Sequence, residues 1–250
     1  MLTRQWRSKM RSLKTVLVKG DDVMEVWLRL LRYCVQNKSE ASFGDENNPK
    51  RIGAEICSRV VLEENAVNQL IDGAALGDDL RLPFRRGAIQ KYIDEYTLEY
   101  IEEQAQLPTG HNQKFTYTYY DRFRRYPVGT EKIDQVSILR ENIGRQIKSE
   151  IFSNRHQMIT WIPEIDIMSS EPPCLQRVWM SRVDTRSVEA HLDWRSRDGY
   201  GAWHVNLIAI ISMLYRDIAL PNGVRITRVI DSCDSFHVYA GDLQKVESIV

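Results

Sequence analysis

Residues 205–220, VNLIAIISMLYRDIAL, contain the longest apolar run of the chain, and this run decides the fold. A helix that is apolar around its whole circumference is buried on all sides, so we expect the segment to form the central helix. The run is shorter than the about 18 apolar residues that cross a bilayer, and it ends in Arg216-Asp217. The segment therefore predicts a buried core helix, and we expect no membrane partner.

Shorter patterns on both sides of this helix predict strands and further helices. Apolar and β-branched runs predict strands over residues 14–19, 56–62, 158–162, 176–183, 187–194, 224–231 and 235–239. Helical spacing of apolar residues predicts helices over 23–34, 88–103 and 133–148, the first capped by Asp21 or Asp22. Asp184-Thr185-Arg186 is expected to form a hairpin turn between two of the strands. The pattern predicts an α+β fold with a mixed sheet covered by helices.

Several further expectations complete this layout. The polar stretch 38–50 is expected to be a loop, and the aromatic segment 115–120 is expected to lead into another loop that ends at 124–127. Cys57 and Val61 are expected in the core. Because no linker interrupts the chain, we expect a single domain over residues 14–250, after a basic leader over 1–13 that can be disordered.

The composition narrows the class of protein. The chain has 250 residues with 34 basic and 34 acidic side chains, so its formal net charge is zero, which argues against a protein that coats nucleic acid. Its four cysteines form no CxxC or CxxH pair, which argues against a zinc site. The N-terminus lacks the apolar core of a secretory signal. We therefore expect a cytoplasmic protein with free thiols, no metal and no nucleic-acid partner.

A cysteine directly ahead of a predicted strand is the first candidate for chemistry. Pro172-Pro173-Cys174 fixes a thiol at the mouth of the strand, because two prolines make the approach rigid. A thiolate is a strong nucleophile near neutral pH, above all beside a guanidinium. The alternative is a buried, inert cysteine, which is the commoner fate of a lone thiol.

Two further groups suit a nucleotide. In an extended segment Arg195 and Arg197 share one face, and a guanidinium with the nearby Ser196 hydroxyl suits a phosphate monoester. The alternative is a solvated pair of Arg197 with Asp198. Asn206, at the start of the apolar helix, carries a donor and an acceptor that match the ring edge of uracil, or it caps the helix.

His237 and Tyr239 form the last candidate group. Alternation along a strand places both side chains on one sheet face, where they can bind a sugar hydroxyl. The alternative is a half-buried polar pair at a strand end.

These groups follow one another in the order found in thymidylate synthases, and the chain resembles that family from about residue 115 to 242. Asn206 stands eleven residues after Arg195, as in the family. Ile133-Asp134-Gln135 is similar to a family segment, and Asn154-Arg155 stands where two arginines precede a strand that ends in Trp161. The segments SRDxxxAWxxN and PPCLQ resemble the archaeal-type and phage-borne branch.

The resemblance implies transfer of a one-carbon unit from 5,10-methylenetetrahydrofolate to carbon 5 of dUMP, giving dTMP. Cys174 would be the nucleophile, with Arg195 beside thiolate and phosphate, Asn206 on the ring, and Tyr119 near the proton of carbon 5. Glu95, with Glu99 as rival, would relay protons through water.

The resemblance also implies the binding residues. Ser196 and Arg51, with Lys50 as an alternative, would bind phosphate, while His237 and Tyr239 would hold the 3′-hydroxyl. Asp198 would bind the folate pterin. Arg155 would come from the other subunit of a homodimer formed through the sheet.

Two other functions stay open. Asn154 and Leu175 depart from the common family pattern, so a hydroxymethylase acting on dUMP or dCMP, in which water captures the intermediate, is an alternative. An inactive nucleotide-binding relative is a third hypothesis, although retention of Cys174 with Arg195, Asn206 and Asp198 argues against it.

Overall fold

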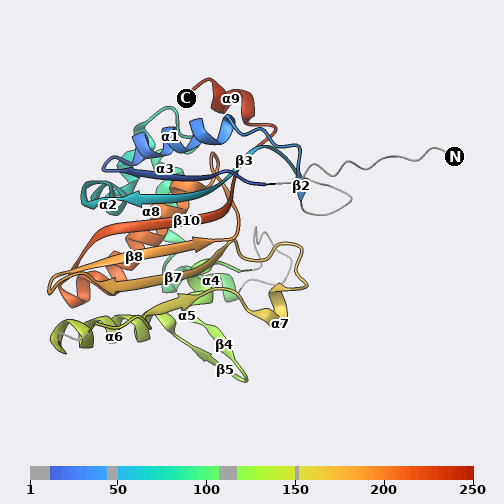
Figure 1. Cartoon of the computed structure of the whole chain (residues 1–250). Helices are drawn as coiled ribbons and strands as arrows, with labels where there is room; N and C mark the ends of the chain where they lie inside the picture. Colours follow the sequence, from blue (N-terminus) through green and yellow to red (C-terminus); the bar gives the residue numbers. More distant parts are fainter. Residues whose placement is uncertain (1–11, 44–49, 107–116, 150–151) are drawn as a thin grey trace.

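A computed structural model describes residues 12–43, 50–106, 117–149 and 152–250, arranged around one mixed β-sheet (Figure 1). Across the sheet the strands run in the order β1 (Thr15–Gly20), β3 (Lys50–Leu62), β10 (Arg225–Tyr239), β8 (Ser187–Trp194), β7 (Leu175–Arg182) and β6 (Gln157–Ile159). The short strands β2 (Ser42–Phe43) and β9 (Arg197–Asp198) pair with β3 and β10. Apart from Ser12 and Leu13, the expected leader lies outside the described residues.

Parallel and antiparallel pairs occur in the same sheet. β1 is parallel to β3, and β10 is parallel to β8, whereas β3 with β10, β7 with β8 and β6 with β7 are antiparallel. A separate hairpin joins β4 (Tyr126–Val128) to β5 (Glu131–Ile133). The α+β class and the mixed sheet are therefore confirmed.

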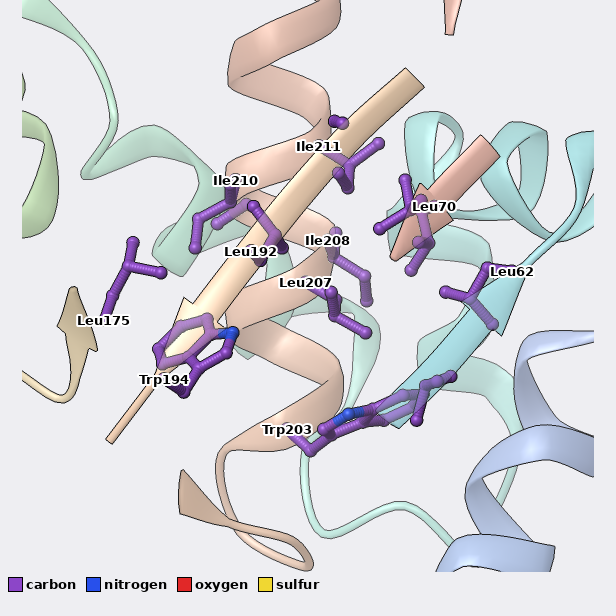
Figure 2. Close-up of a cluster of buried hydrophobic side chains, with 14 of the residues drawn as sticks. Leu62, Leu70, Leu175, Leu192, Trp194, Trp203, Leu207, Ile208, Ile210 and Ile211 are labelled. Atoms are coloured by element: carbon purple, nitrogen blue, oxygen red, sulfur yellow. The ribbon is translucent and has the colours of Figure 1, made fainter. Parts of the chain in front are cut away.

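The central helix is α8 (Trp203–Leu214), and eleven of its twelve residues are buried. Figure 2 shows Leu207, Ile208 and Ile211 of α8 gathered with Leu192 of β8 and Leu62 of β3. The predicted helix over 205–220 thus begins earlier, and its last part continues as a π turn (Tyr215–Ala219) and a 3-10 turn (Leu220–Asn222). Within the described ranges, no helix is long and apolar enough to span a bilayer.

The remaining helices cover the sheet or close its ends. α1 (Val23–Val35) begins at Asp22, whose side chain accepts from the Glu25 backbone N–H at 2.8 Å, as one of the two predicted caps. The other helices that the structure describes are α2 (Glu64–Ile71), α3 (Arg86–Asp94), α4 (Leu98–Gln106), α5 (Tyr119–Arg124), α6 (Gln135–Ser149), α7 (Pro163–Asp166) and α9 (Leu243–Glu247), with a 3-10 turn over Gly73–Asp78.

Two helix predictions are wrong in instructive ways. The single helix expected over 88–103 is broken into α3 and α4, because the Thr97 hydroxyl caps a new first turn at the Tyr100 N–H, 3.3 Å away. The loop expected before 127 contains α5, which starts at Thr118, whose hydroxyl accepts from the Asp121 N–H at 3.0 Å. Residues 115 and 116 of the aromatic segment lie outside the described residues.

Three predictions about the strands and the loop before β3 differ from the structure. The loop expected over 38–50 contains β2 and the first residue of β3. β3 is longer than predicted, and Cys57 and Val61 are only half-buried, because the opposite phase of the strand faces the core. The two strands expected at the end of the chain are one strand, β10, which continues through a register shift between Cys233 and Phe236.

The two faces of the sheet differ. In the central strands, one alternating set of side chains is buried against the helices, for example Val188, Ala190 and Leu192 of β8. The other set is half-buried or exposed, as for Trp179 of β7 and Leu17 of β1, which is 67% exposed. The sheet thus has one helix-covered face and one open face.

Candidate active site

Cys174 and Arg195 are brought together by the antiparallel pairing of β7 with β8. Leu175 and Trp194 are partners in this ladder, so the residue before the first strand lies beside the residue after the second. The Arg195 backbone N–H donates to the Cys174 carbonyl at 3.0 Å. The hairpin predicted from the sequence therefore places the candidate nucleophile and the candidate cation side by side.

The Arg195 guanidinium holds the segment that carries the thiol. Its Nε donates to the Pro173 carbonyl at 3.0 Å, and one terminal nitrogen donates to the Pro172 carbonyl at 2.6 Å. That same nitrogen lies 3.7 Å from Cys174 Sγ. Prolines lack an N–H but keep a carbonyl acceptor, so two prolines in sequence suit this fork of donors.

The Cys174 thiol is half-buried, and opposing effects act on it. Burial raises its pKa above the ordinary 9.0, while the positive charges of Arg195, Arg197 and Lys50 oppose the rise. The net direction is upward, so the resting group is a thiol at neutral pH. The three cations nevertheless reduce the free-energy cost of forming a thiolate at this position.

Tyr119 lies against the same site. It is the first residue of α5, and its ring stands edge-on to the Trp194 ring with centroids 5.8 Å apart. Burial raises the pKa of Tyr119 well above its usual range, and the nearby Cys174 and Tyr92 add to the rise. Tyr119 is therefore a neutral hydroxyl beside the thiol.

Asn206 lies in the second turn of α8, past the helix N-cap at Ala202, so it does not cap the helix. Its side chain is 8% exposed, and Oδ1 accepts from the Tyr92 hydroxyl at 2.6 Å. Glu95 follows the last residue of α3; burial raises the pKa of both Tyr92 and Tyr96, and the charge of Glu95 adds to the rise. The rival Glu99 is exposed in the first turn of α4. The charge of Glu95 therefore acts on Tyr92, the residue that contacts Asn206.

Asp198 and His237 are partners between β9 and β10. The Asp198 Oδ1 accepts from the backbone N–H of Tyr200 at 3.0 Å and of Gly201 at 2.9 Å. Burial raises the pKa of Asp198. A Cβ at Gly201 would lie 2.5 Å from Asp198 Oδ2, so the glycine leaves room for this carboxylate.

His237 and Tyr239 lie on one face of β10, as predicted. Their rings are edge-on with centroids 5.0 Å apart. His237 Nδ1 lies 3.1 Å from the Ser235 carbonyl, and because a carbonyl only accepts, Nδ1 carries the hydrogen. Burial raises the pKa of Tyr239 to about 12, with further contributions from Asp198 and Cys174.

A cleft of about 450 Å³ adjoins Tyr239 and is lined by Lys50, Arg51 and residues 240–242. Both basic side chains are exposed there. Ser196 is half-buried in the short gap between β8 and β9. Asp242 also lines this cleft, whose two basic side chains make it a candidate anion site, and the charge of Lys50 acts on the Cys174 thiol.

Arg155 is not brought to this site. It is exposed just before β6, and its backbone N–H donates to the Ser153 hydroxyl at 3.4 Å. Burial lowers the pKa of the neighbouring His156, and the charge of Arg155 adds to that shift. The other predicted site residues lie along the strand ends and helices described above. Any role for Arg155 in the same site would require a second copy of the chain.

A buried carboxylate beneath the site was missed by the sequence reasoning. Asp231 Oδ1 accepts from Trp194 Nε1 and from an Arg197 terminal nitrogen, both at 2.7 Å, and Oδ2 accepts from Trp203 Nε1 at 2.9 Å. Arg197 also donates to the Trp203 carbonyl at 2.6 Å, and its guanidinium carbon lies 3.9 Å from the Trp194 ring centroid. Figure 2 shows both indoles in the core around α8.

The alternative of a solvated strand end with a surface Arg–Asp pair is therefore wrong, because Arg197 pairs with Asp231 inside the protein. The chain bends between β8 and β9, so alternation is lost there, and Arg197 is buried with Asp231. The sequence of β10 indicated a buried carboxylate, because Asp231 occupies the same strand phase as the apolar Val229 and Cys233. A charge in a buried phase must be paired.

Within the described ranges, no group of three or more His, Cys, Asp or Glu side chains is placed to hold a metal ion. The cysteines at 34, 57, 174 and 233 are free.

Comparisons with known proteins point to one family. The sequence profile of the thymidylate synthase family matches residues 90–250. A protein named "Putative thymidylate synthase" from Methanothermobacter marburgensis is 26% identical over 237 residues, which cover 93% of this chain and 97% of that protein. A protein of the same name from Methanosarcina acetivorans is 34% identical over 156 residues, covering 61% of this chain and 67% of that protein. The archaeal source of these relatives agrees with the branch that the sequence resembles.

Proposed function

Because this chain belongs to the thymidylate synthase family, we propose that it transfers a one-carbon unit from 5,10-methylenetetrahydrofolate to carbon 5 of dUMP, giving dTMP. The observation that carries the proposal is the contact between Arg195 and Cys174, which joins a cation to a nucleophile at a strand mouth. Two exposed basic side chains, Lys50 and Arg51, line the adjoining cleft. This arrangement suits a pyrimidine nucleotide with an anionic tail.

Cys174 is the nucleophile in this mechanism. A bond forms between Sγ and carbon 6 of the uracil ring, and the electrons of the 5,6 double bond move toward oxygen 4, so carbon 5 becomes nucleophilic. Since burial keeps the resting thiol protonated, its proton passes to solvent water as the bond forms. Arg195 favours that step, because its charge stabilises the thiolate.

The ring is held and protons are moved by groups around the thiol. Asn206 hydrogen-bonds the ring edge and stabilises the negative charge that develops on oxygen 4. Glu95, near the Tyr92–Asn206 contact, exchanges protons with that edge through water. Tyr119, neutral and beside Cys174, assists removal of the proton from carbon 5.

The sugar and phosphate are bound at the strand ends. His237 and Tyr239 hold the 3′-hydroxyl of the deoxyribose, a role supported by their adjacent rings. The phosphate is bound by Arg195, Ser196 and Arg51, with Lys50 in the same cleft. Charge-assisted hydrogen bonds of this kind supply most of the affinity for a phosphate monoester.

Asp198 is the residue that fits the folate. A pterin ring presents N–H donors, and Asp198 presents a carboxylate whose Oδ2 side is kept open by Gly201. When bound, 5,10-methylenetetrahydrofolate supplies the carbon and the reducing hydride. Asp198 orients the folate. The backbone N–H groups of Tyr200 and Gly201 in turn hold the Asp198 carboxylate in place.

A homodimer through the sheet completes the proposal. The open face carries apolar side chains such as Leu17 and Trp179, which a second copy would cover. Arg155, exposed and apart from its own site, would then reach the phosphate of the partner subunit. Asn154 beside it carries no charge, so Arg155 would act there without an adjacent arginine.

The test is mass analysis of the product formed from dUMP, and separately from dCMP, with methylenetetrahydrofolate. A methyl product with dihydrofolate supports the proposal, whereas a hydroxymethyl product with tetrahydrofolate identifies the water-capturing alternative. A parallel incubation with 5-fluoro-dUMP and the folate should trap a covalent adduct on Cys174. Nucleotide binding without any adduct would instead identify an inactive relative.

A further inference from the structure

The amide of Asn206 can read a pyrimidine in two ways. A uracil ring presents an acceptor at oxygen 4 and a donor at N3, whereas a cytosine ring presents a 4-amino donor and an N3 acceptor. The side-chain amide of Asn has an NH₂ group that donates and an oxygen that accepts. A half-turn about the last side-chain bond swaps their positions, so one orientation fits uracil and the other fits cytosine. Asn206 alone therefore does not determine the choice; its orientation does.

Tyr92 fixes that orientation from the neighbouring helix. Its hydroxyl donates to Asn206 Oδ1 at 2.6 Å, which brings α3 and α8 together over the site. Burial raises the pKa of Tyr92 to about 12, so the hydroxyl keeps its proton at neutral pH. With Oδ1 turned to Tyr92, the amide nitrogen is the end that donates to an acceptor on the ring.

The reverse orientation is disfavoured by what surrounds Tyr92. If the amide turned, its NH₂ group would face the Tyr92 oxygen, and the Tyr92 proton would need another acceptor. The Tyr96 ring lies edge-on to the Tyr92 ring, with the two centroids 5.8 Å apart. A turned amide would break the 2.6 Å hydrogen bond that the Tyr92 hydroxyl donates to Oδ1, and the loss of a hydrogen bond is costly in a largely buried site.

We propose that Tyr92 is a specificity-determining residue that holds the Asn206 amide in the orientation that fits uracil and rejects cytosine. The inference rests on the proposed function, because it assigns the ring that the same site prefers. It adds a residue of α3 that need not touch the nucleotide at all.

The test measures the affinity of dUMP and of dCMP by calorimetry for the wild type and for Tyr92→Phe, which removes only the hydroxyl. The wild type should prefer dUMP, and the variant should lose about tenfold of that preference. Tyr120→Phe is the matched control, since it removes a hydroxyl that donates to Asp217 at 3.1 Å from a buried tyrosine of α5. Its preference should stay at the wild-type value.

The outcomes separate this inference from the proposed function. Equal weakening of both nucleotides in Tyr92→Phe would mean a structural role and would overturn the inference, as would an unchanged preference. Equal binding of dUMP and dCMP by the wild type would also overturn the inference, but it would not contradict the proposed enzymatic function. A wild type that binds neither nucleotide overturns both.

Discussion

The Arg195 guanidinium lies 3.7 Å from Cys174 Sγ while it donates to the carbonyls of both prolines that precede the thiol. One side chain thus sets the position of the nucleophile and its charge environment. A change at Arg195 should therefore affect the thiol before any substrate is present.

Replacing Arg195 with Met should make Cys174 less acidic. In the wild type the alkylation rate with iodoacetamide should rise with pH and level off above pH 9, because burial raises the thiol pKa above 9.0. Removing the cation that opposes this rise moves the profile to still higher pH. Because less thiolate is present at a given pH when the thiol pKa is higher, we expect alkylation of Cys174 at pH 8 to be clearly slower than in the wild type. Peptide mass analysis follows Cys174.

Two controls keep this experiment interpretable. Cys57, half-buried on the open face of the sheet, should show the same profile in both proteins. Arg195→Lys keeps the charge and should fall between the wild type and the Met variant. An unshifted Cys174 profile in Arg195→Met would contradict the electrostatic role.

Cys174→Ser should abolish turnover and leave dUMP affinity within about threefold, because phosphate binding rests on the basic residues. Steady-state assays and calorimetry measure the two quantities. Substantial residual activity of Cys174→Ser would contradict the covalent mechanism.

Subunit exchange tests the proposed role of Arg155. Arg155→Ala should lose most activity, as should Cys174→Ser, because each homodimer lacks an essential group in both sites. Mixing the two under mild denaturation and refolding should restore activity, since some heterodimers contain one site with both groups intact. Absence of recovery, with heterodimers verified by native mass spectrometry, would mean that Arg155 serves its own subunit or none.

Asn206→Asp should move the preference toward dCMP, because a carboxylate accepts from a 4-amino group and repels oxygen 4. Competition between dUMP and dCMP for the enzyme gives the ratio directly. An unchanged ratio would contradict the assignment of Asn206 to the ring edge.

Arg197 and Asp231 should be strongly coupled in stability. Both side chains are 1% exposed, so Arg197→Met leaves a buried carboxylate without its cation and should cost about 3–5 kcal/mol. The double variant Arg197→Met/Asp231→Leu should be destabilised by less than the sum of the two single variants. Urea unfolding measures all three.

A surface pair supplies the comparison. Lys19 lies 2.8 Å from Glu63, with 66% and 33% of the side chains exposed, so Lys19→Met should cost under about 1 kcal/mol. For the buried pair, if the unfolding free-energy changes of the Arg197 and Asp231 single variants simply added up in the double variant, the two side chains would not act as a pair.

Much of the site followed from local patterns. The bounds of β8 match the predicted strand over 187–194, and its hairpin with β7 places Cys174 beside Arg195. The Asp22 cap and the shared face of His237 and Tyr239 also followed, since they depend on neighbours along the chain.

What failed depends on contacts between distant segments. Tyr92 of α3 donates to Asn206 of α8, and the periodicity of 88–103 did not predict this contact. The burial of Arg197 depends on Asp231, thirty-four positions later in the chain. Helical and strand periods report which face is apolar, but they do not say which distant polar partner a buried charge will meet.

The carboxylate of Asp231 serves one guanidinium and two indoles at once. Loss of one member removes a hydrogen bond from this buried cluster, and loss of Asp231 leaves three donors without their shared acceptor, so we expect single substitutions at these positions to be costly. We expect Trp194, Arg197, Trp203 and Asp231 to be inherited as a block, and relatives that replace one to have exchanged the whole set.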